Sequence, residues 1–205
     1  MAKNIYNESL YAKQVRYKHS LNLIVICKQK NKFRKELMKK LYDEVFKMKN
    51  LLRRGWIQRE IPNRTESDAE HCYSMIMLAL EIMSKNDLKL DQLKVLKMIA
   101  YHEVGEIDAG DATIVDNIPK EVKYQREYDG TKRIAEEYEM PEILDLWLEF
   151  EKCETPEAQF VKRLDKFDCV LQSKVYSEIY DKPELFEEFK TNGKEYYNDM
   201  KKFKR

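Results

Sequence analysis

Apolar side chains recur at three- and four-residue steps along most of this 205-residue chain, a spacing that places them on one face of a helix. After residue 30, no segment shows the alternation of apolar and polar residues that is typical of a half-buried strand. Only five Gly and five Pro punctuate the pattern. We therefore predict an all-α protein: a single helical bundle of six or seven helices over residues 33–205, with an N-terminal extension over residues 1–32.

The expected helices begin at recognisable capping signals. Ser67 and Glu70 have the spacing of a capping box, and Asp91 can cap the next helix. Thr155 followed by Pro156 and an acid is a typical helix start. Residues 56–66 are expected to form a loop. The helices are predicted at about 33–52, 67–85, 91–106, 120–138, 141–151, 155–180 and from 183 onward, the last weakened at Gly193.

Composition excludes several classes of protein. Aromatic residues make up 11% of the chain and hydrophobic residues 43%, which argues against disorder. The longest aliphatic run near the N-terminus, residues 23–27, is far shorter than a membrane span, and the first 20 residues lack the apolar core of a signal peptide. The four cysteines are widely spaced and form no CxxC pair. We expect reduced thiols, no membrane partner and a cytoplasmic location.

Charge is unevenly distributed although the net charge is only +1. Residues 1–40 hold 11 Lys/Arg and 2 Glu, whereas the rest of the chain is acidic on balance. Such a basic segment is either a solvated arm or a contact for nucleic acid or an acidic neighbour. Because no aromatic interleaving or nucleic-acid motif accompanies it, we favour the solvated arm and expect no nucleic-acid partner.

Histidines and acids within apolar helical segments are the candidate chemical groups. His71 shares a helix face with apolar residues, and His102 lies in a second apolar segment, followed directly by Glu103. Glu106 is one turn beyond His102, and Asp165 interrupts an apolar stripe much later in the chain. A single such histidine is often a buried core residue. Asp165 has an alternative as well, an ion pair with a neighbouring Lys or Arg, because a buried carboxylate needs a partner.

Two histidines with two carboxylates suit a divalent transition metal such as Mn²⁺, Fe²⁺, Co²⁺, Ni²⁺ or Zn²⁺, whereas Mg²⁺ prefers oxygen ligands alone. At a helix bend, His102 and Glu103 can reach one ion from the same side. Such an ion orients a phosphate and lowers the pKa of a bound water. Glu106 and Asp111 then have the chemistry of a general base and a general acid.

The order His71, His102-Glu103 and Asp165 resembles the H…HD…D signature of the HD-domain metal-dependent phosphohydrolases. The 5′-deoxynucleotidase branch is the closer resemblance, and it covers about residues 35–180. The segments that carry it are Arg53-Arg54-Gly55-Trp56, Glu66-Ser67-Asp68-Ala69-Glu70-His71, residues 102–111 from His102-Glu103 to Gly110-Asp111, and Phe160-Val161-Lys162-Arg163-Leu164-Asp165-Lys166.

The resemblance implies a role for each matching position. His71, His102 and Asp165 match metal ligands, and Glu103 stands where the family has the Asp that gives it its name. Glu106 and Asp111 match the acids beside the attacking water and the leaving group. Arg53 and Trp56 match the segment that approaches the nucleotide phosphate and sugar; the alternative is a helix-ending Arg with a core Trp. The resemblance also implies a single divalent transition metal ion as cofactor and a homodimer.

Three functions remain open on this basis. The first is metal-dependent hydrolysis of phosphate monoesters, with deoxynucleoside 5′-monophosphates giving deoxynucleoside and phosphate. The second is hydrolysis of another nucleotide or phosphate ester by a related HD hydrolase. The third is a non-catalytic nucleotide-binding regulator, which the replacement of Asp by Glu103 keeps open. We expect the first, with a small-molecule nucleotide as the substrate.

Overall fold

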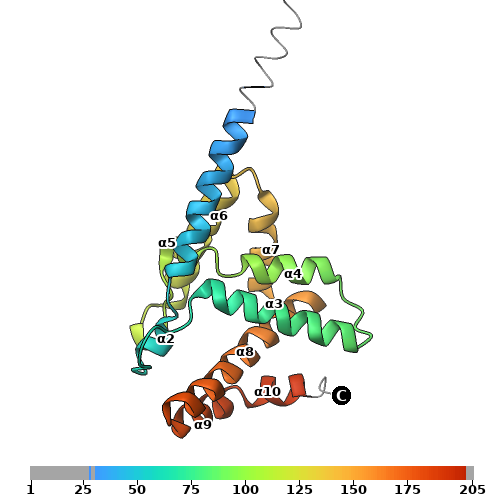
Figure 1. The fold of residues 1–205 in the computed structure, drawn as a ribbon. Helices are drawn as coiled ribbons and strands as arrows, with labels where there is room; N and C mark the ends of the chain where they lie inside the picture. Colours follow the sequence, from blue (N-terminus) through green and yellow to red (C-terminus); the bar gives the residue numbers. More distant parts are fainter. Residues whose placement is uncertain (1–27, 29–30, 202–205) are drawn as a thin grey trace, which may run out of the picture. The chain divides into compact units, whose positions relative to one another are not determined.

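The computed structural model describes residue 28 and residues 31–201 (Figure 1). The expected N-terminal extension, with its excess of Lys and Arg, therefore lies almost entirely outside the described residues. The chain separates into two compact units, residues 1–43 and 44–205. Residues 31–43 of the first unit are helical, and the second unit begins with helical residues 44–50. The second unit contains the site described below.

The prediction of an all-α fold is confirmed. Within the described residues, the only β pairing is an isolated antiparallel bridge between Leu52 and Ser67. The helices that follow residue 50 are α2 (Arg54–Ile57), α3 (Asp68–Lys85), α4 (Gln92–Tyr101), α5 (Glu106–Ala109), the 3₁₀ helix η1 (Ile114–Asp116), α6 (Lys120–Glu137), α7 (Pro141–Lys152), α8 (Pro156–Tyr180), α9 (Pro183–Asn192) and α10 (Lys194–Lys201). No helix in this part of the chain is long and apolar enough to cross a membrane.

The capping signals read from the sequence begin the helices as expected. Ser67 accepts a hydrogen bond from the Glu70 amide, and the Glu70 side chain accepts one from the Ser67 amide, which completes the capping box. Asp91 accepts from the Lys94 amide at the start of α4. Thr155 accepts from the Ala158 amide at the start of α8. Side-chain acceptors thus satisfy amides that the first turn of each helix leaves unpaired.

One expected helix, residues 91–106, is divided in two. Helix α4 ends at Tyr101, and α5 begins at Glu106. Between them, the Val104 and Glu106 amides donate to the carbonyls three residues earlier, those of Tyr101 and Glu103. This pattern tightens the turn relative to an α-helix. The tight turn carries His102 and Glu103, so the departure from the prediction occurs at the candidate site itself.

Two glycines allow α5 to approach α6 closely. A Cβ at Gly105 would lie 2.3 Å from the Glu127 carbonyl oxygen, and a Cβ at Gly130 would lie 2.6 Å from the Gly105 carbonyl oxygen. Neither contact is tolerable, because both obstacles are backbone atoms. The two glycines therefore hold the turn that carries Glu103 directly against α6.

The main core lies between α3, α4, α7 and α8 in the second unit, where α4 and α8 each contact all the others. Met75, Val95 and Leu164 are completely buried there. A smaller cluster, formed by Trp56, Ile61, Tyr176 and Leu185, packs the α2 region against the end of α8 and the start of α9. The candidate site lies where α3, the turn after α4 and the middle of α8 converge.

Candidate metal centre

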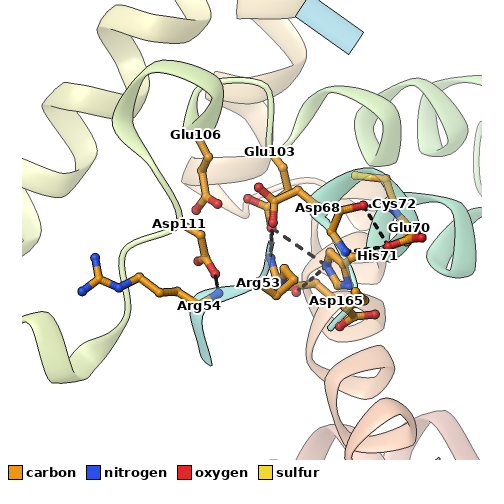
Figure 2. Close-up of polar contacts among 12 residues, drawn as sticks. Arg53, Arg54, Asp68, Glu70, His71, Cys72, Glu103, Glu106, Asp111 and Asp165 are labelled. Carbon is orange, nitrogen blue, oxygen red and sulfur yellow. Dashed lines mark hydrogen bonds and ion pairs between the residues drawn. The ribbon is translucent and has the colours of Figure 1, made fainter. Parts of the chain in front are cut away.

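Four side chains from three separate parts of the chain converge within the second unit: His71 from α3, His102 and Glu103 from the tight turn after α4, and Asp165 from α8. One donor atom from each lies within 4.8 Å of the donor atoms of the others. Nε2 of His71 is 3.3 Å from Oδ1 of Asp165 and 3.9 Å from Oε1 of Glu103. Figure 2 shows His71, Glu103 and Asp165 pointing toward one another. Residues up to 94 positions apart in sequence thus form one cluster.

The imidazole rings are oriented by hydrogen bonds on the edge that faces away from this cluster. Nδ1 of His102 donates to the Ile99 carbonyl oxygen at 2.8 Å. Nδ1 of His71 lies 2.7 Å from Oδ2 of Asp168, and Oδ1 of Asp168 accepts a hydrogen bond from Ser74. In a neutral ring, a proton on Nδ1 leaves a lone pair on Nε2. Both Nε2 atoms therefore present lone pairs toward the two carboxylates.

These atoms fit a divalent cation. Nε2 of His71 and Nε2 of His102 are buried and make no hydrogen bond. Lone pairs and carboxylates that face one another in a buried site repel unless a positive charge lies between them. A metal ion supplies that charge, and two imidazoles with two carboxylates suit a transition metal. The orphaned nitrogens and the donor set thus agree with the cofactor predicted from the sequence, without selecting which metal.

The pKa directions show how strongly the cluster favours positive charge. Burial, the largest single influence, opposes protonation of His102, but Glu103 and Cys72 together outweigh it and raise the His102 pKa to about 10. Burial likewise opposes ionisation of Asp165, yet Lys166 and His71 hold the pKa of its carboxyl well below the usual range. Without a metal, protons on the histidines would neutralise the carboxylates. Metal binding therefore competes with protons.

Glu103 reaches the cluster despite replacing the shorter Asp. Its Oε1 lies 3.3 Å from Nε2 of His102, although adjacent residues of a regular α-helix point about 100° apart. The tightened turn between α4 and α5 brings the two side chains to the same side. The same Oε1 also accepts a hydrogen bond of 2.9 Å from Arg53, so an ion held by this oxygen would share it with the guanidinium.

Asp165 makes a contact that corresponds to each of the two interpretations that the sequence left open. Its Oδ1 faces Nε2 of His71, while its Oδ2 accepts a 2.9 Å hydrogen bond from Lys166. One oxygen is therefore in an ion pair, and the other points into the cluster.

Arg53 is placed by the backbone that precedes α3. The Arg53 amide donates to the Glu66 carbonyl, and the Asp68 amide donates to the Leu51 carbonyl, on either side of the Leu52–Ser67 bridge. This pairing fixes the residue before α2 against the start of α3. The guanidinium then extends to Glu103 and lies 3.7 Å from Asp68.

A cavity of about 620 Å³ opens beside the cluster. Arg53, His102, Glu103 and Asp165 line it, as do Glu106 and Asp111. Its size is within the usual range of small-molecule sites. Figure 2 shows Glu106 and Asp111 next to Glu103, separate from His71 and Asp165. The two acids are thus near the cluster but outside the group of converging donor atoms.

Glu106 and Asp111 have different surroundings. Burial, followed by the negative charges of Glu103 and Asp111, raises the pKa of the Glu106 carboxyl well above its usual value, while Lys123 opposes this shift. Lys123 lies 3.4 Å from Oε1 of Glu106, and Oε2 is buried without a hydrogen bond. Asp111 instead accepts a short hydrogen bond from the backbone amide of Arg54. It therefore ties the loop after α5 to α2.

Trp56 is in the position of a core residue, the alternative that the sequence left open. Its side chain is only 3% exposed, and its ring packs edge-on against Tyr176 and stacks with Phe189. Nε1 donates a 2.6 Å hydrogen bond to Glu66. Trp56 is absent from the residues that line the cavity. We find that it supports the site from behind, by holding Glu66 and α9.

Sequence analysis missed three residues of the site. Asp168 lies one turn after Asp165 on the same buried face of α8, and that spacing was a usable signal. Lys123, on α6, contacts Glu106, and no local sequence pattern indicates that these two residues are neighbours. Asp68 is completely buried, and burial together with the Glu103 charge raises its pKa to about 8. An acid in the first turn of a helix is so common that Asp68 carried no signal.

A second group of donor atoms, from Glu66, His71 and Asp168, also lies within 4.8 Å. Its atoms are already used in hydrogen bonds: Glu66 accepts from Trp56, and Asp168 is bound by His71 and Ser74. This group is therefore the support of His71 and not a separate ion site.

Comparison with known proteins agrees with this geometry. The family model for the HD domain matches residues 45–203. The chain is 34% identical over 148 residues to 5′-deoxynucleotidase HDDC2 of Homo sapiens, a match that covers 71% of each chain. It is 38% identical over 140 residues to 5′-deoxynucleotidase HDDC2 of Dictyostelium discoideum, covering 63% of this chain and 72% of the other.

Solved structures give the same family of folds. A conserved hypothetical protein from Pyrococcus furiosus has a TM-score of 0.63 at 27% identity, covering 80% of this chain and 98% of that one. A predicted metal-dependent phosphohydrolase from Magnetospirillum magnetotacticum has a TM-score of 0.58 at 22% identity, covering 83% and 96%, and shows likeness of fold alone. With a family match across most of its length and the converging histidines and acids, the chain belongs to the HD-domain family of metal-dependent phosphohydrolases.

Proposed function

We propose that this protein hydrolyses deoxynucleoside 5′-monophosphates to deoxynucleoside and phosphate, with one divalent transition metal ion held by His71, His102, Glu103 and Asp165. The observation that carries the proposal is the pair of buried, unpartnered Nε2 atoms that face two carboxylates at the edge of a 620 Å³ cavity. The substrate class is supported by relatives named 5′-deoxynucleotidases at 31–38% identity.

When bound, the ion would offset charge on the phosphate and make water a stronger acid. The protein's own acids then move the protons. Glu106 suits the general base, because burial and the neighbouring negative charges raise its pKa and so make its carboxylate a stronger proton acceptor. Asp111 suits the general acid that protonates the leaving 5′ oxygen. Both line the cavity, so both face a bound phosphate ester.

Arg53 would contact the phosphate. Its guanidinium lines the cavity and already donates one hydrogen bond to Glu103, which fixes its position. The Glu103 carboxylate offsets part of the cost of keeping this cation buried, since its Oε1 lies 2.9 Å from the guanidinium. A planar guanidinium has donors left over for phosphate oxygens, a geometry in which two parallel hydrogen bonds are common.

We also infer a cytoplasmic location and a homodimer. Cys72, Cys153 and Cys169 are free thiols in the described part of the chain, which suits a reducing compartment. The dimer is proposed from the family resemblance and is tested by measuring the mass of the purified protein in solution.

The proposed activity is tested by metal analysis followed by a substrate panel. We expect about one transition metal ion per chain, and phosphate release from deoxynucleoside 5′-monophosphates in preference to ribonucleotides and sugar phosphates. Chelation should abolish release and lower the melting temperature, because a ligand of the folded state stabilises it. Asp165→Ala should reduce both metal content and melting temperature. Full metal content in that variant, or phosphate release that survives chelation, would contradict the proposal.

A further inference from the structure

The cavity extends beyond the proposed metal centre to a wall that the mechanism does not use. Gly55 and Arg59, from α2 and the turn after it, and Phe189, from α9, line this wall. If the phosphate binds at the metal centre, as the proposed function requires, the rest of the nucleotide must be accommodated by other parts of the same cavity. The side chains of this wall therefore indicate which part of the nucleotide it contacts.

Several contacts hold the planar guanidinium of Arg59 in one position and orientation. Its Nε and one terminal nitrogen donate to the two carboxylate oxygens of Glu188, and its other terminal nitrogen donates to the Gly55 carbonyl at 2.9 Å. The guanidinium carbon lies 4.7 Å from the centre of the Phe189 ring. That ring stacks in turn with Trp56, with 4.8 Å between ring centres. Hydrogen bonds and ring contacts thus fix both the position and the tilt of the guanidinium.

This arrangement suits an uncharged flat ligand better than a phosphate. The paired contact with Glu188 neutralises the Arg59 charge and occupies the fork that would otherwise grip two phosphate oxygens. What Arg59 retains is the face of a planar, delocalised group, and guanidinium planes stack on nucleobases. The side chain is 29% exposed and lines the cavity, so part of it is open to a ligand.

We propose that Arg59, backed by Phe189 and Trp56, is the stacking platform for the nucleobase. This inference rests on the proposed function for the position of the phosphate, and adds the residue that makes binding depend on the base. It also assigns a role to Trp56: the indole supports the platform from behind without contacting the substrate.

The test distinguishes stacking of the base on the guanidinium plane from attraction to the positive charge of Arg59. Arg59→Lys keeps a cation that can pair with Glu188 but removes the plane, and Arg59→Ala removes both. We compare deoxyadenosine 5′-monophosphate with 2-deoxyribose 5-phosphate, which lacks the base, as substrates of the full-length, metal-loaded protein. Both variants should lower kcat/KM for the nucleotide by about tenfold, the scale of a lost base stack, through KM. Turnover of the abasic phosphate should stay unchanged.

Lys190→Ala is the matched control. Lys190 is on the same helix as Phe189, pairs with Glu187 and lies 5.3 Å from the Phe186 ring, but it is absent from the cavity lining. It should leave both substrates unaffected. An equal loss on both substrates in the Arg59 variants would overturn the platform and indicate a phosphate contact. Full recovery of nucleotide turnover in Arg59→Lys would also overturn it, since an ion pair that only anchors α9 needs charge alone.

Failure of the proposed function is detected separately. Binding of the phosphonate analogues, in which a methylene replaces the bridging 5′ oxygen, is measured by calorimetry and needs no turnover. If the wild-type protein releases no phosphate from any deoxynucleotide, the proposed function fails. The platform is still supported if the nucleoside phosphonate binds at least tenfold more tightly than the abasic one and Arg59→Lys removes the difference. Equal binding of the two analogues by the wild-type protein would overturn the platform.

Discussion

Oδ2 of Asp168 lies 2.7 Å from Nδ1 of His71, on the opposite edge of the ring from the Nε2 atom that faces Glu103 and Asp165. A carboxylate in this position fixes the tautomer and orientation of the imidazole and makes the other nitrogen a better ligand. Asp168 is itself held by a 2.6 Å hydrogen bond from Ser74, on the next turn of α3 after His71. The carboxylate that orients the His71 ring is therefore itself fixed by a hydrogen bond.

Asp168→Asn should weaken metal binding by about 10- to 100-fold, the usual effect of losing such a partner. The amide keeps the size of the side chain but removes the charge that polarises His71. Titration of metal-free protein with Zn²⁺ or Mn²⁺ measures the change. Ser74→Ala is the graded control: it removes the hydroxyl contacts to Asp168 and to the His71 carbonyl but keeps the Asp168 charge, so it should have a smaller effect. Unchanged affinity in Asp168→Asn would show that His71 needs no such support.

Glu103→Gln should weaken metal binding and remove most turnover, because it takes a negative charge from the cluster while preserving length. Glu103→Asp should retain part of the activity, clearly above Glu103→Gln, since it keeps the charge in surroundings built around the longer side chain. Metal content and phosphate release, measured on the same preparations, give both results. Intact metal and turnover in Glu103→Gln would remove Glu103 from the set of ligands.

Glu106→Ala and Asp111→Ala should retain metal and lose turnover by about 100-fold or more, the usual scale of a general acid or base. The two variants should differ in stability. Asp111 accepts the Arg54 amide, so its removal also loosens α2, whereas Glu106 has one oxygen 3.4 Å from Lys123 and the other buried without a partner, so less is lost with it. Melting curves with activity assays separate these effects. Loss of metal in either variant would place that acid among the ligands instead.

Arg53→Ala should lower kcat/KM for nucleotide monophosphates more than for an aryl phosphate, if Arg53 grips the nucleotide phosphate and its surroundings. It should also destabilise the protein, because Glu103 and the buried Asp68 lose their cation. Arg53→Lys keeps the charge but not the fork, so it should restore stability more fully than activity. Equal losses on both substrates would contradict a contact with the nucleotide beyond the phosphate that the two substrates share.

Most of the fold was predictable because its signals are local. The capping box at Ser67 and Glu70, the Pro156 helix start and the three- and four-residue spacing of apolar residues involve neighbours in sequence. The helix expected over 91–106 was wrong at its C-terminal end. Its tight turn is set by close packing of Gly105 against Gly130 on α6, a contact across 25 residues that no local pattern reports.

The same distinction applies to the site. The sequence by itself determined the helical class, the helix starts and the residue types that suit a metal: two histidines and acids within apolar segments. Only the tertiary structure decided that His71, Glu103 and Asp165 share one centre, that Asp168 supports His71, and that Trp56 is a core residue while Arg59 lines the cavity. The physical reason is that helix formation follows from neighbouring residues, whereas a binding site depends on how whole helices pack.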